Sequence, residues 1–255
     1  MMGVLRTERV SIDFGGLRAV DNLDFQIGDE IVGLIGPNGS GKTTFLNIIS
    51  GIYKPTRGRV YFNGEDITSL PPHMIRAKGI ARTFQTNRLC LNLSILDNML
   101  LGLYCQQQTT WWQAIFMSSS SSREIKLGIE KSLAILAHFN PALITRAYEP
   151  VMTIPLIDRR RIEIARAVVG DPRLVLLDEP TAGLNSEETN QMINDIAKIR
   201  RRSSQISIII IEHDMTVISR ITERVVCLNA GQKIAEGTFS EVARNELVRT
   251  AYLGG

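Results

Sequence analysis

The chain has 255 residues, of which 44% are hydrophobic and 22% charged, and its net charge is +3. This length and composition suit one large α/β domain whose core needs no disulfide or metal to hold it. The net charge is too small to argue for a nucleic-acid partner, and the basic triplets at 159–161 and 200–202 are interpreted as solvated helix faces or termini. No apolar run is long enough to span a membrane, and the N-terminus has no signal-peptide core. If a membrane is involved, another chain must cross it.

The first third of the chain is predicted to contain strands and tight turns. GRVYFNGEDI, residues 58–67, alternates around Asn63-Gly64, a pair that closes a β-hairpin. DEIVGLIG, residues 29–36, is a compact apolar strand, and KTTFLNIIS, residues 42–50, follows with helical periodicity. A glycine-rich turn therefore joins a buried strand to the start of a helix.

This turn, GPNGSGKTT, covers Gly36–Thr44 and contains the phosphate-binding pattern G-x-x-x-x-G-K-[ST]. Its glycines let successive backbone N–H groups turn inward, and the helix N-terminus behind them adds partial positive charge. Lys42 is expected to reach the β- and γ-phosphates of a nucleotide, and the Thr43 hydroxyl to ligate Mg²⁺. The predicted nucleotide contacts in this loop are Asn38, Gly39, Ser40, Gly41, Lys42, Thr43 and Thr44.

The middle of the chain, from about 91 to 139, is predicted to be helical with an interruption at 106–122. The interruption contains Trp111 and Trp112, for which local packing and contact with a membrane-embedded partner both stay open. A serine run at its end is interpreted as a connector or helix cap.

The last third alternates between strands and helices. Strand patterns at 173–179 and 205–211 are each followed by a helical pattern, and residues 224–237 form a hairpin pattern. Such alternation predicts an α/β fold with a mostly parallel sheet covered by helices on both faces. The predicted division is a core lobe at about 1–88 and 155–255 with an inserted helical subdomain at about 89–154.

Polar side chains follow the strands of this predicted sheet, where ligands of α/β proteins bind. Asp178 ends the strand LVLLD and is expected to hold the Mg²⁺ shell, while Glu179 is the candidate general base for the attacking water. His213, after IIIIE, is expected to contact the γ-phosphate. Gln85, in ARTFQ, is placed to touch both Mg²⁺ and a moving lobe. Phe14, in DFGG, is a candidate platform for stacking adenine, with a core aromatic as the alternative.

In order and spacing, Phe14, the loop Gly36–Thr44, Gln85, the pair Asp178–Glu179 and His213 resemble the ATP-binding cassette (ABC) ATPase family. The similarity covers essentially the whole chain. The stretches GIARTFQ, LDEPTAGLN, EHDM, KIAEGT and AYLGG are similar to ATPase subunits of branched-chain or hydrophobic amino-acid importers, a group that includes urea importers.

This resemblance implies a P-loop NTPase core with a mostly parallel sheet, an N-terminal antiparallel β part and an inserted α-helical subdomain. It implies an ATPase that uses ATP and Mg²⁺ and pairs head to tail with a second ABC ATPase subunit, identical or different. Two transmembrane permeases would move the substrate, which a periplasmic or lipid-anchored binding protein would deliver. The chain would then lie on the cytoplasmic face of the inner membrane, held by the permeases, with no nucleic-acid partner.

The family's signature loop, close to L-S-x-G-Q, is degenerate in this chain. Ile154 stands at the leucine, Pro155 at the serine, Leu156 at the variable position, Ile157 at the glycine and Asp158 at the glutamine. Proline has no hydroxyl or N–H, isoleucine adds a branched Cβ, and aspartate adds negative charge. Asp158 is predicted to be the N-cap of a helix that begins at Arg159. Since the family's loop reaches the partner's γ-phosphate, the degenerate loop predicts an asymmetric dimer whose partner site turns over slowly.

Several alternatives stay open. Pro155 and Ile157 also fit a subunit that binds ATP and hydrolyses it weakly or not at all. A cytosolic ABC ATPase acting on ribosomes or DNA is disfavoured, because the chain has one cassette and no heptad run. Asn185, where the family often has aspartate, is sufficiently explained as a helix cap with Glu188 three residues on.

Overall fold

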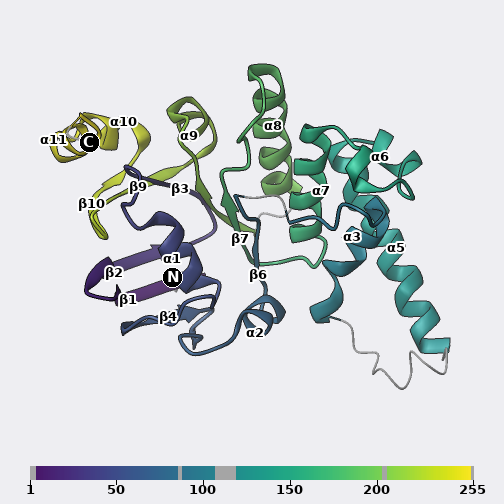
Figure 1. Cartoon of the computed structure of the whole chain (residues 1–255), viewed down its shortest axis with the longest axis horizontal. Coiled ribbons are helices and arrows are strands. Elements are labelled where there is room, and N and C mark those ends of the chain that lie inside the picture. Colours follow the sequence, from purple (N-terminus) through teal and green to yellow (C-terminus); the bar gives the residue numbers. More distant parts are fainter. Residues whose placement is uncertain (1–3, 86–87, 107–118, 203–205, 254–255) are drawn as a thin grey trace.

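The computed structural model of the chain describes residues 4–85, 88–106, 119–202 and 206–253. It contains an antiparallel sheet near the N-terminus, a second and mostly parallel sheet, and a group of helices at one end of the molecule (Figure 1). The predicted α/β fold with an N-terminal antiparallel part and a helical region is confirmed.

The antiparallel sheet has the strand order β2-β1-β4-β5. Its strands are β1 (Leu5–Phe14), β2 (Leu17–Ile27), β4 (Arg57–Phe62) and β5 (Glu65–Asp66). Asn63 and Gly64 join β4 to β5 with φ values of 49° and 82°, so the predicted hairpin is confirmed.

The second sheet has the order β10-β9-β3-β8-β7-β6, and only the β10–β9 pair is antiparallel among the described strands. The strands are β3 (Ile31–Ile35), β6 (Ile80–Arg82), β7 (Leu174–Asp178), β8 (Ser207–Ile211), β9 (Arg224–Asn229) and β10 (Gln232–Gly237). Since β3, β6, β7 and β8 run parallel, their carboxyl ends meet at one edge of the sheet.

The mostly parallel sheet is buried on both faces. Val32 and Leu34 of β3 pack in one apolar cluster with helix α1 (Lys42–Ile49) and the antiparallel sheet. Ile31 and Ile35 of the same strand belong to a second cluster, which contains residues of the helices on the opposite face. This explains why the strand sequences are continuous apolar runs.

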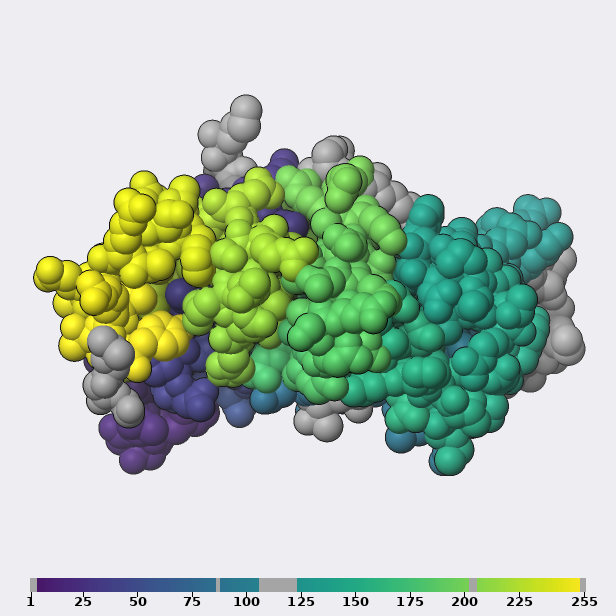
Figure 2. All heavy atoms as spheres, turned by 90° about the horizontal axis from the view of Figure 1, so that it is seen from above, coloured from purple at the N-terminus to yellow at the C-terminus, as the bar shows by residue number. Residues whose placement is uncertain are grey.

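The remaining helices lie in three places (Figure 1): on the face of the mostly parallel sheet away from α1, at the two ends of the molecule, and beside the edge strands. They are α2 (Pro72–Ala77), α3 (Ile95–Leu101), η1 (Tyr104–Gln106), α5 (Ser119–Phe139), α6 (Ala142–Thr145), η2 (Val151–Thr153), α7 (Leu156–Val168), α8 (Ser186–Arg202), α9 (Met215–Ile221), α10 (Phe239–Arg244) and α11 (Glu246–Leu253). Figure 2 shows the C-terminal residues at one end and the helices around α5 at the other, with the α8 region between them.

Helix α7 joins the helical region to the sheet, because it packs against α3 and α5 and also against β6 and β7. It carries all three arginines of the triplet 159–161, which was interpreted above as a solvated face, and that interpretation is wrong for two of them. Arg160 and Arg161 are buried, and Arg161 Nε lies 2.8 Å from Asp195 Oδ2 of α8. The division into a core lobe and a helical subdomain stays a prediction.

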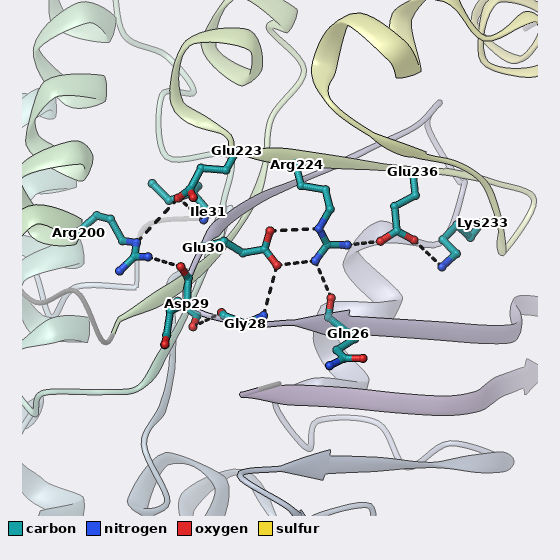
Figure 3. A network of polar contacts seen from close by, with 11 residues as sticks. Gln26, Gly28, Asp29, Glu30, Ile31, Arg200, Glu223, Arg224, Lys233 and Glu236 are labelled. Atoms are coloured by element: carbon teal, nitrogen blue, oxygen red, sulfur yellow. Dashed lines mark hydrogen bonds and ion pairs between the residues drawn. The ribbon is translucent and has the colours of Figure 1, made fainter. Parts of the chain in front are cut away.

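A polar network holds the opposite edge of the sheet, where β3 and β9 begin (Figure 3). Arg224 donates to both carboxylate oxygens of Glu30, at 3.1 and 2.7 Å, and to the Gln26 carbonyl at 2.7 Å. Glu223 Oε1 accepts a hydrogen bond from the Ile31 N–H at 3.1 Å. These contacts hold together the starts of the neighbouring strands β3 and β9.

Within the described ranges, no helix is both long and apolar enough to cross a membrane. Trp111 and Trp112 lie outside the described residues.

Candidate active site

The sequence-predicted polar residues meet at the carboxyl edge of the mostly parallel sheet. The phosphate loop follows β3, Glu179 follows β7, and His213 lies two residues after β8. Gln85 lies three residues beyond β6, the edge strand next to β7. The strand order therefore brings together four segments that are far apart in the sequence.

The phosphate loop is a tight turn with an exposed tip. Asn38, Gly39 and Thr43 are exposed, whereas Ser40 is buried. The buried Lys42 ammonium donates to the carbonyls of Gly36 at 2.7 Å and Pro37 at 2.9 Å. Burial lowers the pKa of Lys42, against the opposing effect of nearby carboxylates. The loop thus holds a positive charge at its centre, as an anion-binding site requires.

Close backbone packing explains the first glycine of this loop. Gly36 has φ 147°, and a Cβ there would lie 2.1 Å from the Leu228 carbonyl oxygen. Gly39 has φ 76°, but a Cβ there would meet nothing within 4 Å.

We expect Gly36→Ala to displace the phosphate loop and abolish measurable ATP binding. Gly39→Ala should cost only the left-handed backbone strain, about 1–2 kcal/mol. Calorimetric titration with ATP and thermal unfolding of both variants would check this. Equal losses of ATP affinity in the two variants would show that the left-handed backbone conformation, and not the space for a Cβ, makes glycine necessary at position 36.

Asp178 is almost fully buried, at 2% exposed, and its Oδ2 lies 3.1 Å from Arg82 Nη2. Its Oδ1 is buried without a hydrogen-bond partner among the described residues. Burial raises the pKa of Asp178, and Arg82 opposes that rise. Mg²⁺ prefers oxygen ligands, and this carboxylate oxygen accepts no hydrogen bond among the described residues. The Thr43 hydroxyl of the phosphate loop can supply a second oxygen. The residues therefore fit Mg²⁺ bound together with nucleotide phosphates.

Two of the other predicted residues contact the Glu179 carboxylate. Gln85 Nε2 donates to Glu179 Oε2 at 3.1 Å, and His213 Nε2 lies 2.8 Å from Glu179 Oε1. Glu179 has φ 50°, a left-handed conformation that costs a non-glycine residue about 1–3 kcal/mol. Such strain at a strand end fits a side chain held for chemistry.

Phe14, at the end of β1, is 42% exposed. Its ring packs edge to face on Tyr53, with centroids 5.2 Å apart and an interplanar angle of 69°. The Phe14 ring is therefore partly exposed and partly packed against Tyr53. Its role as a platform for adenine stays a prediction.

The degenerate signature loop differs from its sequence-based description in two respects. The helix begins at Leu156 with Pro155 as N-cap, so the prediction of Asp158 as N-cap is wrong. The proline ring fixes its own φ at about −65°, which suits the N-cap backbone of φ −55° and ψ 155° observed at Pro155. Asp158 lies in the first turn, buried, and accepts hydrogen bonds from Arg161 at 2.9 Å and Asn140 at 3.1 Å. Its charge is paired inside the protein.

The side chains of the loop also point in different directions. Ile157 is only 8% exposed and belongs to the core cluster of the helices, whereas Leu156 is 41% exposed. The isoleucine at the glycine position therefore fills the interior, and Pro155 and Leu156 form the exposed tip.

Sequence reasoning missed three residues at this edge. Arg82 pairs with Asp178, Tyr252 of α11 lies beside the Gly36 backbone, and Glu212 holds the turn after Glu179. Glu212 Oε1 accepts from the Thr181 N–H at 2.8 Å and from its hydroxyl at 2.7 Å. The strand-end rule that identified His213 could have found Glu212, whereas no local pattern marks the other two.

The free energy of unfolding of Glu212→Gln, compared with that of the native chain, is expected to increase as pH rises. Burial raises the pKa of Glu212, so the folded state binds that proton more tightly than the unfolded state does. Its contribution to the free energy of unfolding therefore falls as pH rises above the ordinary carboxyl pKa of about 4.3. Urea unfolding of both proteins between about pH 4 and 7 would measure the difference.

Glu241→Gln is the matched control with the opposite sign. The Thr238 backbone N–H lowers the pKa of Glu241, so this acid stabilises the fold above its unfolded pKa. If the difference in free energy of unfolding from the native chain changed with pH in the same direction for both variants, the expected opposite signs would be contradicted.

Comparison with known proteins identifies the family of the chain. Residues 20–182 match the ABC transporter family, and residues 232–255 match the branched-chain amino acid ATP-binding cassette transporter family. The chain belongs to the ABC transporter ATPase family. This ABC ATPase is 35% identical, over 98% of both chains, to the high-affinity branched-chain amino acid transport ATP-binding protein BraF of Pseudomonas aeruginosa. It is equally similar to LivG of Escherichia coli, again at 35% identity over 98% of both chains.

A solved ABC transporter cassette in its ADP conformation has the same fold. It matches the ABC ATPase with a TM-score of 0.84 and 28% identity over 100% of both chains. The phosphate loop and the cluster around Glu179 thus lie in a chain with the fold of an ABC transporter cassette.

Proposed function

We propose that this ABC ATPase hydrolyses ATP with Mg²⁺ to drive the import of branched-chain or other hydrophobic amino acids through partner permeases. The observation that carries the proposal is the match over nearly the whole chain to ATP-binding proteins of branched-chain amino acid transport. The separate match of residues 232–255 supports the same substrate class. Urea is the alternative substrate.

The site geometry supports hydrolysis and not binding alone. Glu179, held by Gln85 and His213, takes the proton of the attacking water. Lys42 leaves its loop carbonyls to contact the phosphates, and the loop N–H groups hold them in line. Thr43 and Asp178 would hold Mg²⁺, with Gln85 beside it, and the metal would supply positive charge to the phosphates.

The partners follow from the same family. A second ABC ATPase subunit, two permeases and a periplasmic or lipid-anchored substrate-binding protein complete the importer. The chain is then peripheral at the cytoplasmic face of the membrane. The altered loop from Pro155 to Asp158 supports a pair of unequal ATPase subunits, in which this chain hydrolyses the ATP on its own phosphate loop and weakens turnover at the partner's.

Uptake of labelled substrate tests the proposal. Cells lacking this chain should lose most uptake of labelled leucine and valine, and the native chain should restore it. Glu179→Gln should not restore it, although the protein accumulates to the same level. Restored uptake of urea but not of amino acids would identify the alternative substrate. Unchanged uptake of both would refute an importer function.

A further inference from the structure

Arg82, the last residue of β6, connects three elements of the ATP site. Its side chain is only 5% exposed. The guanidinium donates to Asn47 Oδ1 at 2.7 Å and Ser50 Oγ at 2.9 Å, both on or directly after α1. The same group pairs with Asp178 of β7 at 3.1 Å. One planar side chain thus ties the helix behind the phosphate loop to the strand that ends in the metal-holding acid.

The Asp178 carboxylate depends on this contact for its orientation. Oδ2 accepts from Arg82, and Oδ1 has no hydrogen-bond partner among the residues that the structure describes. The backbone N–H of Asp178 bonds to Thr83 Oγ1 at 3.3 Å, which fixes the main chain but not the side chain. No other described side chain is within hydrogen-bond distance of Oδ2. Without Arg82 the carboxylate would be free to rotate.

Arg82 also reaches the segment that carries Gln85. Its guanidinium carbon lies 5.0 Å from the centroid of the Phe84 ring, and that of Arg88 lies 4.2 Å from the same ring. The Phe84 ring, directly before Gln85, therefore contacts two cations, and Gln85 contacts Glu179. Arg82 therefore contacts Asp178 and also the residue directly before Gln85.

We propose that Arg82 is a positioning residue for Mg²⁺: it holds Oδ2 of Asp178 so that Oδ1 stays available to the metal shell. The inference rests on the proposed function, because it assumes that Mg²⁺ and ATP bind at this loop. Residues that orient a metal ligand through its second atom typically affect metal affinity by about 10- to 100-fold when they are changed. Arginine suits the role because its planar, rigid fork directs separate N–H groups at acceptors on two elements, whereas the ammonium of lysine is a compact point charge on a flexible stem.

The test separates metal binding from nucleotide binding. A non-hydrolysable ATP analogue is titrated calorimetrically in excess EDTA, and Mn²⁺ binding to the analogue-loaded protein is followed by electron paramagnetic resonance. The variants are Arg82→Gln, Arg82→Lys and Ser50→Ala, the last of which removes one acceptor of Arg82 and leaves the buried charges in place. Arg161→Gln is the matched control, because Arg161 forms a comparable buried pair with Asp195 away from the phosphate loop.

Arg82→Gln should weaken Mn²⁺ binding by about 10-fold or more, with analogue binding in EDTA unchanged. Arg82→Lys should lie between it and the native protein, and Ser50→Ala should shift Mn²⁺ affinity less but in the same direction. Arg161→Gln should lower the Tm and leave Mn²⁺ affinity unchanged. Native Mn²⁺ affinity in Arg82→Gln, or an equal loss in Arg161→Gln, would overturn the role of Arg82. Failure of the native chain to bind the analogue at all would instead refute the proposed function.

Discussion

Glu179→Gln is expected to lower the steady-state rate of ATP hydrolysis by about 100-fold or more, because a general base typically contributes 10²- to 10⁴-fold. Glutamine keeps the size of the side chain and an oxygen for the contact with His213, which lies 2.8 Å from Glu179 Oε1. ATP affinity should therefore stay close to that of the native chain. Phosphate release and calorimetric ATP binding, measured on the same preparation, would check both parts.

Glu187→Gln supplies the control for this experiment. Glu187 lies in the first turn of α8 and is exposed, so its loss should leave hydrolysis unchanged. If Glu179→Gln retained more than about a tenth of the native rate, the loss would be smaller than the roughly 100-fold minimum that a general base contributes. Another group would then have to accept the proton.

Pro155→Ser is expected to raise the ATPase rate of the chain acting as a homodimer. Restoring a donor at a developing charge is worth up to about 10²- to 10³-fold, so a rise of about 10-fold or more is the criterion. A serine N-cap can also accept a hydrogen bond from the first turn of α7, which has no side-chain cap. We expect about 1 kcal/mol of added stability from that cap. Phosphate release and urea unfolding would measure the two effects.

Pro155→Ala is the control, because it restores the backbone N–H without a hydroxyl. The native chain should hydrolyse ATP slowly alone and faster with a sister ATPase that has an intact signature loop. Substantial activity of the native homodimer, unchanged in Pro155→Ser, would refute the asymmetric dimer. Ile157→Gly is a poor test of the same idea, since Ile157 is buried and deleting a buried isoleucine side chain costs about 2–5 kcal/mol.

The sequence was sufficient to predict the fold class and the meeting of the loop with Gln85, Glu179 and His213. Both follow from rules that act locally or along one edge: the glycine-rich turn sets the anion site, and parallel strands end on the same side. The roles of these residues stay predictions, but their proximity needed only the alternation of strands and helices.

Other parts of the site depend on which distant side chains share the interior. A charged triplet has the same appearance in sequence whether it faces water or pairs in the core, so the burial of Arg160 and Arg161 could not be predicted. The helix start at Leu156 was missed because aspartate is a common N-cap, and Asp158 instead pairs with Arg161. Arg82 stands on an edge strand of three residues, which is too short to show a pattern.

The buried charges of α7 have a consequence for how such subunits diverge. Arg161 is tied to Asp195, and Arg160 lies within 3.5 Å of the carbonyls of Gln85 and Ala182. These contacts set the register of the helix from its second turn onward, independently of the exposed tip at Pro155. A gene copy can therefore lose the chemistry of the tip and still produce a folded subunit with its own hydrolytic residues in place. Duplicated ATPases can specialise by this route, one change at a time, without passing through an unfolded ancestor.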